Sequence, residues 1–268
     1  MALTRCCGTK AHGYLRNDVL LTCSGFRDRE VYRSRQIRLQ PRWVGRIGKK
    51  SKLIPKKCIL WARTVENQPR PHLIRDFALY PAYLNRSEQE DLVAELRDIL
   101  KVAPLFQPIT PRGQKMSVRM SAAGRFGWIS DRSGYRYSPT HPNGTPWPDI
   151  PDSILNIWNT VSGCDRMPEC CLINWYGEGA RMGMHQDRDE ADFGAPVLSI
   201  SLGDDGLFRM GNDTRGGKTE SYWLKSGDVV VMGGAARLRY HGVDRIRFGS
   251  STLLPKGGRI NLTLRVVS

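Results

Sequence analysis

Cys171-Leu172-Ile173-Asn174-Trp175-Tyr176 begins the part of the chain that decides the fold. It is the first of a series of short runs rich in apolar, β-branched and aromatic residues, a composition typical of strands. The later runs are Val197–Leu202, Leu207–Met210, Asp228–Met232, Arg237–Val243 and Ile260–Val267. Several short strands in succession, with helices gathered ahead of them, predict an α+β protein whose core is a β-sandwich or a barrel-like roll.

Two amphipathic helices are predicted ahead of these strands. Apolar residues recur at helical spacing over 88–102, and Ser87 with Glu90 three positions later predicts a capping box at the start of that helix. A second helix is predicted over 152–162. The residues between them, 104–150, are rich in Gly, Pro, Arg and aromatic side chains and are expected to be mostly loop.

Composition limits the class of protein. The chain of 268 residues is long enough for one large domain or two small ones. Its 7 cysteines include adjacent pairs, which rarely bridge each other, and no CxxC motif, so the sequence favours neither a disulfide framework nor a structural zinc site. No apolar run reaches the ~18 residues that a membrane span needs. We therefore expect a soluble, cytoplasmic protein with no membrane partner.

The positive charge is concentrated in the first 70 residues. Residues 1–70 carry 17 Lys and Arg against 4 Asp and Glu, so they account for +13 of the net charge of +15 and leave +2 for residues 71–268. A basic arm can add phosphate affinity that is independent of sequence. Residues 1–70 can equally be a disordered extension, residues upstream of the true start, or a transit peptide, which the four acidic residues disfavour. Residues 71–268 are expected to form the domain that carries the chemistry.

Two histidines and an aspartate form a candidate metal site. In an extended strand residues i and i+2 point to the same side, so His185 and Asp187 can share one metal ion, with His241 supplied by a later strand. Two imidazoles and one carboxylate are the ligand set of non-haem Fe(II) oxygenases, which leaves open positions on the metal. The alternative for each histidine is a hydrogen-bonded structural role, which these residues alone do not exclude.

The last strand carries two arginines on one face. The run from Arg259 to Arg265 alternates polar and apolar residues, which places both arginines with Asn261 and Thr263 on one side of the strand. Buried arginines are costly without partners, and a guanidinium binds a carboxylate through two parallel hydrogen bonds. A dicarboxylate cosubstrate would satisfy both arginines, whereas the alternative is a solvated strand face.

These motifs together resemble the AlkB family of Fe(II)- and 2-oxoglutarate-dependent nucleic-acid dealkylases. The resemblance covers 71–268, and it is carried by Leu172–Tyr176, His185–Glu190, Gly227–Val231, Tyr240–Gly242 and Arg259–Arg265, with Met120, Gly127-Trp128 and Gly134–Pro139 further upstream. Met232 departs from it, because close relatives carry Trp at that position. The resemblance implies a double-stranded β-helix (jelly-roll) core with flanking helices and an N-terminal nucleotide-recognition lid at about 104–150.

The resemblance also implies a role for each site residue. The catalytic iron ligands would be His185, Asp187 and His241. Arg259 and Arg265 would hold the two ends of 2-oxoglutarate, with further hydrogen bonds from Asn174, Tyr176 and Asn261. Trp128 would stack on a flipped-out base with the His185 ring on its other face, and Asp189 would read the exocyclic amine of that base. The nucleotide and its backbone would be contacted by Tyr135, Arg136, Tyr137 and Arg215.

The activity that the resemblance implies is DNA repair by oxidative demethylation of bases such as 1-methyladenine and 3-methylcytosine. Fe(II), O2 and the cosubstrate 2-oxoglutarate would be required, succinate and CO2 would form, and the methyl group would leave as formaldehyde. The partner would be alkylated DNA, single-stranded in preference, with RNA left open, and the protein would act as a monomer. One alternative is a 2-oxoglutarate oxygenase of proteins or small molecules, which should lack the aromatic lid. The other is a non-enzymatic nucleic-acid-binding protein that uses the basic arm and needs no iron.

Overall fold

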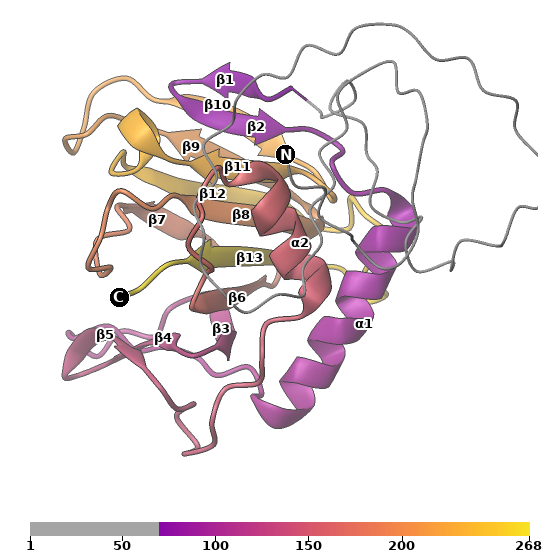
Figure 1. Cartoon of the computed structure of the whole chain (residues 1–268), viewed down its shortest axis with the longest axis vertical. Coiled ribbons are helices and arrows are strands. Elements are labelled where there is room, and N and C mark those ends of the chain that lie inside the picture. The colour runs from indigo at the N-terminus through magenta and orange to yellow at the C-terminus, as the bar shows by residue number, and fades with distance from the viewer. Residues whose placement is uncertain (1–69) are drawn as a thin grey trace, which may run out of the picture. The chain divides into compact units, whose positions relative to one another are not determined.

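Two antiparallel β-sheets form the centre of the protein in the computed structural model, which describes residues 70–268 (Figure 1). The larger sheet has seven strands in the order β1 (His72–Ile74), β2 (Phe77–Tyr80), β11 (Val229–Met232), β8 (Val197–Gly203), β13 (Arg259–Arg265), β6 (Cys170–Tyr176) and β3 (Arg119–Gly124). The smaller sheet has four strands in the order β10 (Glu220–Leu224), β9 (Asp205–Met210), β12 (His241–Arg247) and β7 (Met182–His185). A separate hairpin consists of β4 (Gly127–Asp131) and β5 (Gly134–Ser138).

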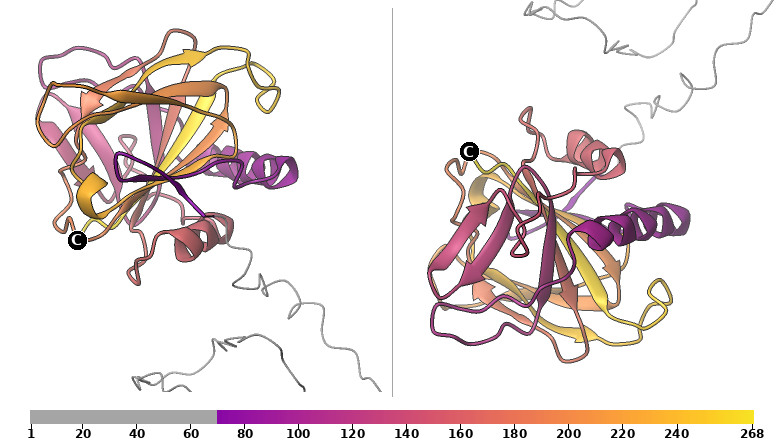
Figure 2. Two further views of the ribbon diagram at one scale, coloured as in Figure 1. Left: turned by 90° about the horizontal axis from the view of Figure 1, so that it is seen from above. Right: turned by 90° about the horizontal axis from the view of Figure 1, so that it is seen from below.

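Each face of the larger sheet is covered by a different partner. One face packs on helices α1 (Arg86–Val102) and α2 (Asp152–Val161), which lie beside the sheets in Figure 2. Their buried side chains share an apolar cluster with alternate residues of β8, β13 and β6. The other face shares a second apolar cluster with β9 and β12 of the smaller sheet. The predicted α+β class with a jelly-roll core and flanking helices is therefore confirmed.

Strand β13 shows how the alternation in the sequence positions the site. Ile260, Leu262 and Leu264 belong to the cluster beneath the helices, so the polar residues between them face the smaller sheet. Because β13 is hydrogen-bonded to β6 on one side and β8 on the other, it lies inside the sheet rather than at its edge. Arg259 and Arg265 are both buried, which excludes the alternative of a solvated strand face.

The start of helix α1 corrects a sequence prediction. The N-cap is Asn85 and not Ser87: the Asn85 side chain accepts a hydrogen bond from the Glu88 backbone N–H at 3.1 Å, and the Glu88 carboxylate accepts one from the Asn85 N–H at 2.8 Å. Asparagine caps a helix as well as serine does, so two overlapping capping signals compete in this stretch. The earlier start places Arg86 one turn before Glu90, and the two side chains form an ion pair of 2.6 Å.

Two further predictions are corrected in the strand regions. Residues 104–150, expected to be mostly loop, contain β3 and the β4–β5 hairpin, because glycines at the strand ends hid short strands in a loop-like composition. The strand predicted over Arg237–Val243 begins only at His241 and continues to Arg247. Ahead of it, Gly234 has a positive φ of 51° and starts a 3-10 turn over Gly234–Ala236, which prevents an extended chain there.

No helix within residues 70–268 is long and apolar enough to cross a membrane. The predicted basic extension of residues 1–70 lies, except for Arg70, outside the residues that the structure describes.

Candidate active site

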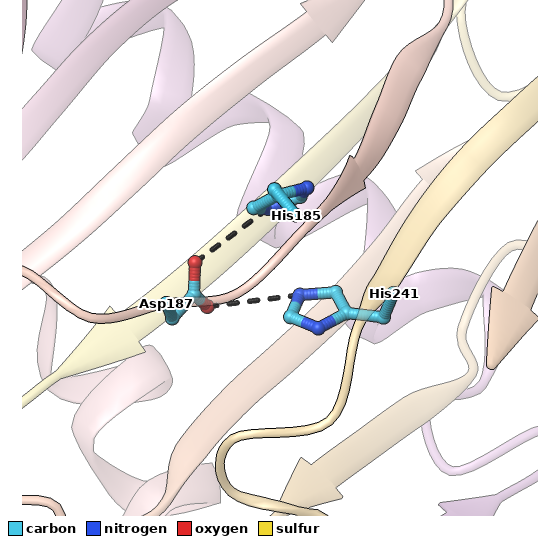
Figure 3. A group of neighbouring side chains, drawn as sticks. All are labelled: His185, Asp187 and His241. Carbon is cyan, nitrogen blue, oxygen red and sulfur yellow. Dashed lines mark ion pairs between the residues drawn. The ribbon is translucent and has the colours of Figure 1, made fainter. Parts of the chain in front are cut away.

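Strands β7 and β12 bring the three predicted metal ligands together (Figure 3). The two strands are paired with His185 opposite His241, and Asp187 follows two residues after His185, just beyond the end of β7. Ligand atoms of the three side chains all lie within 4.8 Å of one another. The Asp187 carboxylate lies between the imidazoles, with Oδ1 at 3.6 Å from His185 Nε2 and Oδ2 at 3.8 Å from His241 Nε2. The sequence prediction that these residues converge is therefore confirmed.

Backbone carbonyl groups orient both imidazoles. His185 Nδ1 lies 2.9 Å from the carbonyl oxygen of Gly183, and His241 Nδ1 lies 3.0 Å from that of Arg239. A carbonyl oxygen only accepts, so Nδ1 carries the proton in both rings and the Nε2 lone pair is left for a metal ion. Burial, reinforced by the neighbouring His185, lowers the pKa of His241 to about 4, which keeps its ring neutral at pH 7.

Asp187 is held in its charged form by its neighbours. Burial opposes the charge, but the Arg265 guanidinium, with its terminal nitrogen 2.9 Å from Oδ1, and the two imidazoles outweigh it and keep the pKa of Asp187 well below its usual range. For His185, burial lowers the pKa, but the hydrogen bond and the charge of Asp187 outweigh burial and raise it. Asp187 Oδ2 is buried and has no hydrogen-bond partner among residues 70–268. One carboxylate oxygen is thus fixed by an arginine, and the other is available for a metal ion.

The three residues open into a pocket of about 440 Å³ between the two sheets. Its wall includes all the predicted site residues except Arg136 and Tyr137. It also includes Met232, the position at which the sequence departs from the family resemblance. The predicted site residues in the wall are Trp128, Tyr135, Asn174, Tyr176, His185, Asp187, Asp189, Arg215, His241, Arg259, Asn261 and Arg265. The pocket therefore joins the candidate metal site to both predicted binding regions.

Arg259 forms one polar end of the pocket. Its side chain is fully buried, and its terminal nitrogens donate to Ser201 Oγ at 2.7 Å and to the carbonyl oxygens of Asp204 and Leu224 at 3.2 and 3.3 Å. A Cβ on Gly206 of β9 would lie 2.8 Å from Arg259 Nε, so only glycine lets that strand pass so close to the guanidinium. These contacts fix a cation at the end of the pocket.

Amide and phenol groups line the wall beside Arg259. Asn261 Nδ2 donates to Ser199 Oγ at 2.6 Å, and the Asn174 Oδ1 atom is buried with no hydrogen-bond partner in the described part of the chain. Burial raises the pKa of Tyr176 to about 12, although Arg259 opposes this shift, so its hydroxyl remains a donor at neutral pH. The pocket therefore offers both donors and acceptors to a polar ligand.

The β4–β5 hairpin supplies an aromatic wall. The ring of Trp128 stacks on that of Tyr135, with a centroid distance of 5.4 Å and an interplanar angle of 15°. The Trp128 indole N–H donates to Asp189 Oδ2 at 2.7 Å. Asp189 is exposed and lies in the segment that follows β7, so this hydrogen bond ties the hairpin to the metal-binding segment. A flat aromatic group and a free carboxylate oxygen therefore stand side by side at the pocket wall.

The remaining predicted nucleotide contacts are placed differently from one another. Arg215 lies at the pocket wall with its guanidinium 5.6 Å from the Tyr240 ring. Arg136 is exposed on the hairpin and forms an ion pair of 2.6 Å with Asp131. The Tyr137 hydroxyl points inward and donates to Glu190 at 2.5 Å.

Sequence reasoning missed two buried charged residues, of which Glu190 is part of the pocket wall and Arg237 is not. Glu190 and Arg237 form an ion pair of 3.0 Å, and their side chains are only 1% and 3% exposed. Glu190 was included in the motif that begins at His185, but nothing in the pattern distinguished it from the exposed Asp189 beside it. No sequence signal identified Arg237, because its partners lie 42–50 residues away along the chain.

Comparison with known proteins finds relatives over most of the chain. Residues 76–265 match the family model of the 2OG-Fe(II) oxygenase superfamily. The alpha-ketoglutarate-dependent dioxygenase AlkB homolog of Caulobacter vibrioides is 50% identical over 194 residues, which are 72% of this chain and 88% of that protein. The alpha-ketoglutarate-dependent dioxygenase AlkB of Escherichia coli is 41% identical over 181 residues, 66% of this chain and 83% of that protein. The solved structure of OsALKBH1 matches with a TM-score of 0.63 and 28% identity, over 73% of this chain and all of that one.

Proposed function

Because the chain belongs to the 2OG-Fe(II) oxygenase superfamily and, within it, to the AlkB family, we propose that it removes alkyl groups oxidatively from nucleic-acid bases. It is an Fe(II)- and 2-oxoglutarate-dependent dioxygenase. The observation that carries the proposal is that one pocket joins the His185–Asp187–His241 cluster, a buried arginine and the Trp128–Tyr135 stack. We propose residues 71–268 as the domain that carries this activity.

The residues present fit both groups that this chemistry needs. Fe(II) would be held by the two imidazole Nε2 atoms and by the Asp187 carboxylate, whose Oδ2 is buried without a hydrogen-bond partner within residues 70–268. The dicarboxylate would be held by Arg259, which is fully buried in the pocket wall, and by Arg265 beside the metal ligand Asp187. When bound, iron and 2-oxoglutarate supply the oxidation of the alkyl carbon by O2, with succinate and CO2 as products.

The other polar residues of the pocket wall would orient the cosubstrate. Tyr176 of β6 is paired with Arg259, and Asn174 of β6 is paired with Asn261, which lies between the two arginines on β13. All three line the pocket, and each carries a hydrogen-bonding group. We assign them to 2-oxoglutarate because the side-chain amides and the protonated phenol match carboxylate and keto oxygens. Arg265 would hold Asp187 in place as well as the nearer carboxylate.

The hairpin would bind the base. Stacking on Trp128 would contribute about 1–3 kcal/mol to binding, and Asp189 would accept a hydrogen bond from the exocyclic amine. N-methylated bases of the predicted type are cationic, and an exposed carboxylate beside an aromatic ring suits a flat cation. The methyl group on the pairing edge also lowers the cost of extruding the base, which favours damaged bases. We propose Arg215, Tyr135, Arg136 and Tyr137 as residues that contact or support the nucleotide.

Several finer points belong to the same proposal. We propose that single-stranded alkylated DNA is the preferred substrate, that RNA is a second candidate, and that the protein acts as a monomer in the cytoplasm. The competing assignment is an oxygenase of proteins or small molecules. The aromatic hairpin and Asp189 favour a flat nucleic-acid base as the substrate over a protein side chain or another small molecule.

The proposal predicts release of formaldehyde from a methylated oligonucleotide. Purified full-length protein with Fe(II), ascorbate and 2-oxoglutarate should release formaldehyde from 3-methylcytosine in single-stranded DNA, and the same oligonucleotide without the methyl group should release none. A panel of methylated and etheno-modified DNA and RNA, single- and double-stranded, would rank the substrates. If iron binds and no member of the panel is turned over, the assignment to nucleic acid is wrong.

The base-stacking role predicts a selective loss in Trp128→Ala. Without the indole, the KM for the methylated oligonucleotide should rise about 10- to 100-fold, since base–aromatic stacking contributes about 1–3 kcal/mol. The KM for 2-oxoglutarate should stay within about twofold. Trp223→Ala is the matched control, because Trp223 lies on β10 against Arg247 and outside the pocket wall. An unchanged oligonucleotide KM in Trp128→Ala would remove the hairpin from base recognition.

A further inference from the structure

A buried cluster of charges lies at one side of the pocket, where Glu190 and Arg265 are part of the wall, and it connects three elements of the fold. Glu190 is at its centre: Oε1 accepts a hydrogen bond from the Tyr137 hydroxyl at 2.5 Å and lies 3.4 Å from Arg265 Nε, and Oε2 accepts from Arg237 at 3.0 Å. Tyr137 belongs to the β4–β5 hairpin, Arg265 to β13, and Arg237 to the turn ahead of β12. The carboxylate of Glu190 therefore links the aromatic hairpin to the arginine that holds a metal ligand.

Arg237 acts as a support and not as a ligand-binding residue. Each nitrogen of its guanidinium donates to a protein acceptor: Nε to the Ala195 carbonyl at 2.8 Å, one terminal nitrogen to the Asp187 carbonyl at 2.7 Å, and the other to Glu190. It thereby ties the backbone of Asp187 to the carboxylate of Glu190. Because each of its three nitrogens has a protein acceptor, Arg237 holds Glu190 in place.

Arg265 is the residue whose position this support controls. It donates to Asp187 Oδ1 at 2.9 Å and to the Tyr137 hydroxyl at 3.3 Å, while Nε faces Glu190. Two arginines and two carboxylates balance in charge within this cluster. A metal ion held by Asp187 would compensate its negative charge, and Glu190 would then be the anion that keeps Arg265 in its place. Without Glu190, the Arg265 guanidinium could move toward any anion that enters the pocket.

Glu190 differs in this respect from the carboxylate beside it. Asp189 is exposed and bonds the Trp128 indole at the pocket wall, whereas the side chain of Glu190 is 1% exposed and directed at Arg265 and Arg237. The two side chains have different partners, Asp189 the Trp128 indole and Glu190 the two arginines, so the pair serves two sites at once. One carboxylate faces the substrate, and the other faces the support of the metal site.

On the premise of the proposed function, we propose that Glu190 is a positioning residue that, braced by Arg237 and by the Tyr137 hydroxyl, sets the position of Arg265 for binding of 2-oxoglutarate and of Asp187 for the metal. It acts through Arg265 and does not itself touch the base. Residues that orient ligand-holding groups in this way commonly change metal affinity or activity about 10- to 100-fold when they are replaced.

The test is the affinity for 2-oxoglutarate, measured without turnover. Full-length protein is loaded with Mn(II) in place of iron and titrated with 2-oxoglutarate by calorimetry, with no nucleic acid present. Glu190→Gln, which keeps the shape and removes the charge, should weaken binding about tenfold or more. Tyr137→Phe, which removes only the hydroxyl, should weaken it about two- to fivefold. Asp192→Asn is the matched control, because it removes the same charge from the same segment, but Asp192 pairs at the surface with Arg166. The affinity of this variant for 2-oxoglutarate should be unchanged.

Further measurements separate positioning from a merely structural role. Thermal unfolding shows how much of each variant is folded. If Glu190 had only a structural role, the substitution would reduce the folded fraction, but that fraction would bind 2-oxoglutarate with the dissociation constant of the unsubstituted protein. When Glu190→Gln and Tyr137→Phe are combined, their effects on the affinity for 2-oxoglutarate should be less than additive, because both substitutions act on Arg265. If Glu190→Gln fails to fold, Tyr137→Phe alone decides the result.

Two results would overturn the inference. One is a dissociation constant for 2-oxoglutarate in folded Glu190→Gln that equals that of the unsubstituted protein. Where Glu190→Gln does not fold, the same result in Tyr137→Phe would overturn the inference. The other is a change confined to the KM for the oligonucleotide, which would make Glu190 a base-reading residue. The titration with 2-oxoglutarate does not depend on whether the natural protein releases formaldehyde from methylated DNA, so failure of this inference and failure of the proposed function are distinguishable.

Discussion

Replacement of Asp187 by alanine is expected to lower the rate of formaldehyde release by about a thousandfold or more, equivalent to about 4 kcal/mol of transition-state stabilisation. Asp187 is the anionic member of the His185–Asp187–His241 cluster, and its Oδ2 lies at 3.8 Å from His241 Nε2 with no hydrogen-bond partner in residues 70–268. Two neutral imidazoles alone bind Fe(II) less tightly and leave its charge unbalanced.

The same substitution has a second consequence at Arg265. The guanidinium would lose its hydrogen bond of 2.9 Å to Asp187 and keep only Glu190 and Tyr137 as partners. Breaking a buried ion pair by removing one partner typically costs about 3–5 kcal/mol, so the thermal midpoint should fall as well.

The measurement must therefore separate loss of metal from loss of fold. Mn(II) binding by calorimetry and the rate at saturating Fe(II) should be recorded below the unfolding temperature of the variant. Asp187→Asn is the informative companion, because it keeps the shape and a hydrogen-bond acceptor for Arg265 but lacks the charge. Asp187→Ala protein that is folded and retains a tenth of the natural rate would show that the cluster is not the metal site.

Replacement of Arg259 by lysine is expected to raise the KM for 2-oxoglutarate about 100-fold, with little change in kcat once the cosubstrate saturates. Truncating one partner of a buried, hydrogen-bonded charge pair costs about 2–5 kcal/mol. Lysine keeps the charge but cannot reproduce the planar fork that contacts Ser201, Asp204 and Leu224 while facing a carboxylate. The metal cluster lies at the other arginine, so Mn(II) affinity should stay within about twofold.

Steady-state kinetics with varied 2-oxoglutarate and a fixed methylated oligonucleotide provide the check. The KM for the oligonucleotide serves as the internal control, because Arg259 is fully buried and its hydrogen bonds go to Ser201, Asp204 and Leu224 rather than to the hairpin. A KM for 2-oxoglutarate within threefold of the natural value would mean that Arg259 is only a structural residue of β9, β10 and β13. Loss of kcat that excess cosubstrate does not restore would contradict the role in binding.

Strand β13 and the ligand cluster show what could be predicted from sequence. The alternation from Arg259 to Arg265 depends only on the geometry of adjacent residues, so the two faces of that strand were assigned correctly. His185 and Asp187 are two residues apart, and their convergence needed only one further partner. Features that depend only on residues close together in the sequence were therefore predictable.

The boundaries and the hairpin show where prediction from sequence failed. Asn85 and Ser87 are both good N-caps, and only the packing and pairing of the whole helix selected the earlier one. The hairpin strands β4 and β5 are short, each begins with a glycine and each carries one charged residue, and they are stabilised by contacts such as the Trp128–Tyr135 stack. Tertiary contacts decide such segments because their local preferences are weak.

The sequence by itself determined the ligand types, the strand that presents both arginines and the family to which the chain belongs. Only the tertiary structure decided which neighbours those residues have. Glu190 meets Tyr137 and Arg237, which are 53 and 47 residues away along the chain, because the hairpin and the turn before β12 fold onto the segment after β7. Such contacts depend on the register of strands that are distant in sequence, and a shift of one residue would turn every side chain to the opposite face.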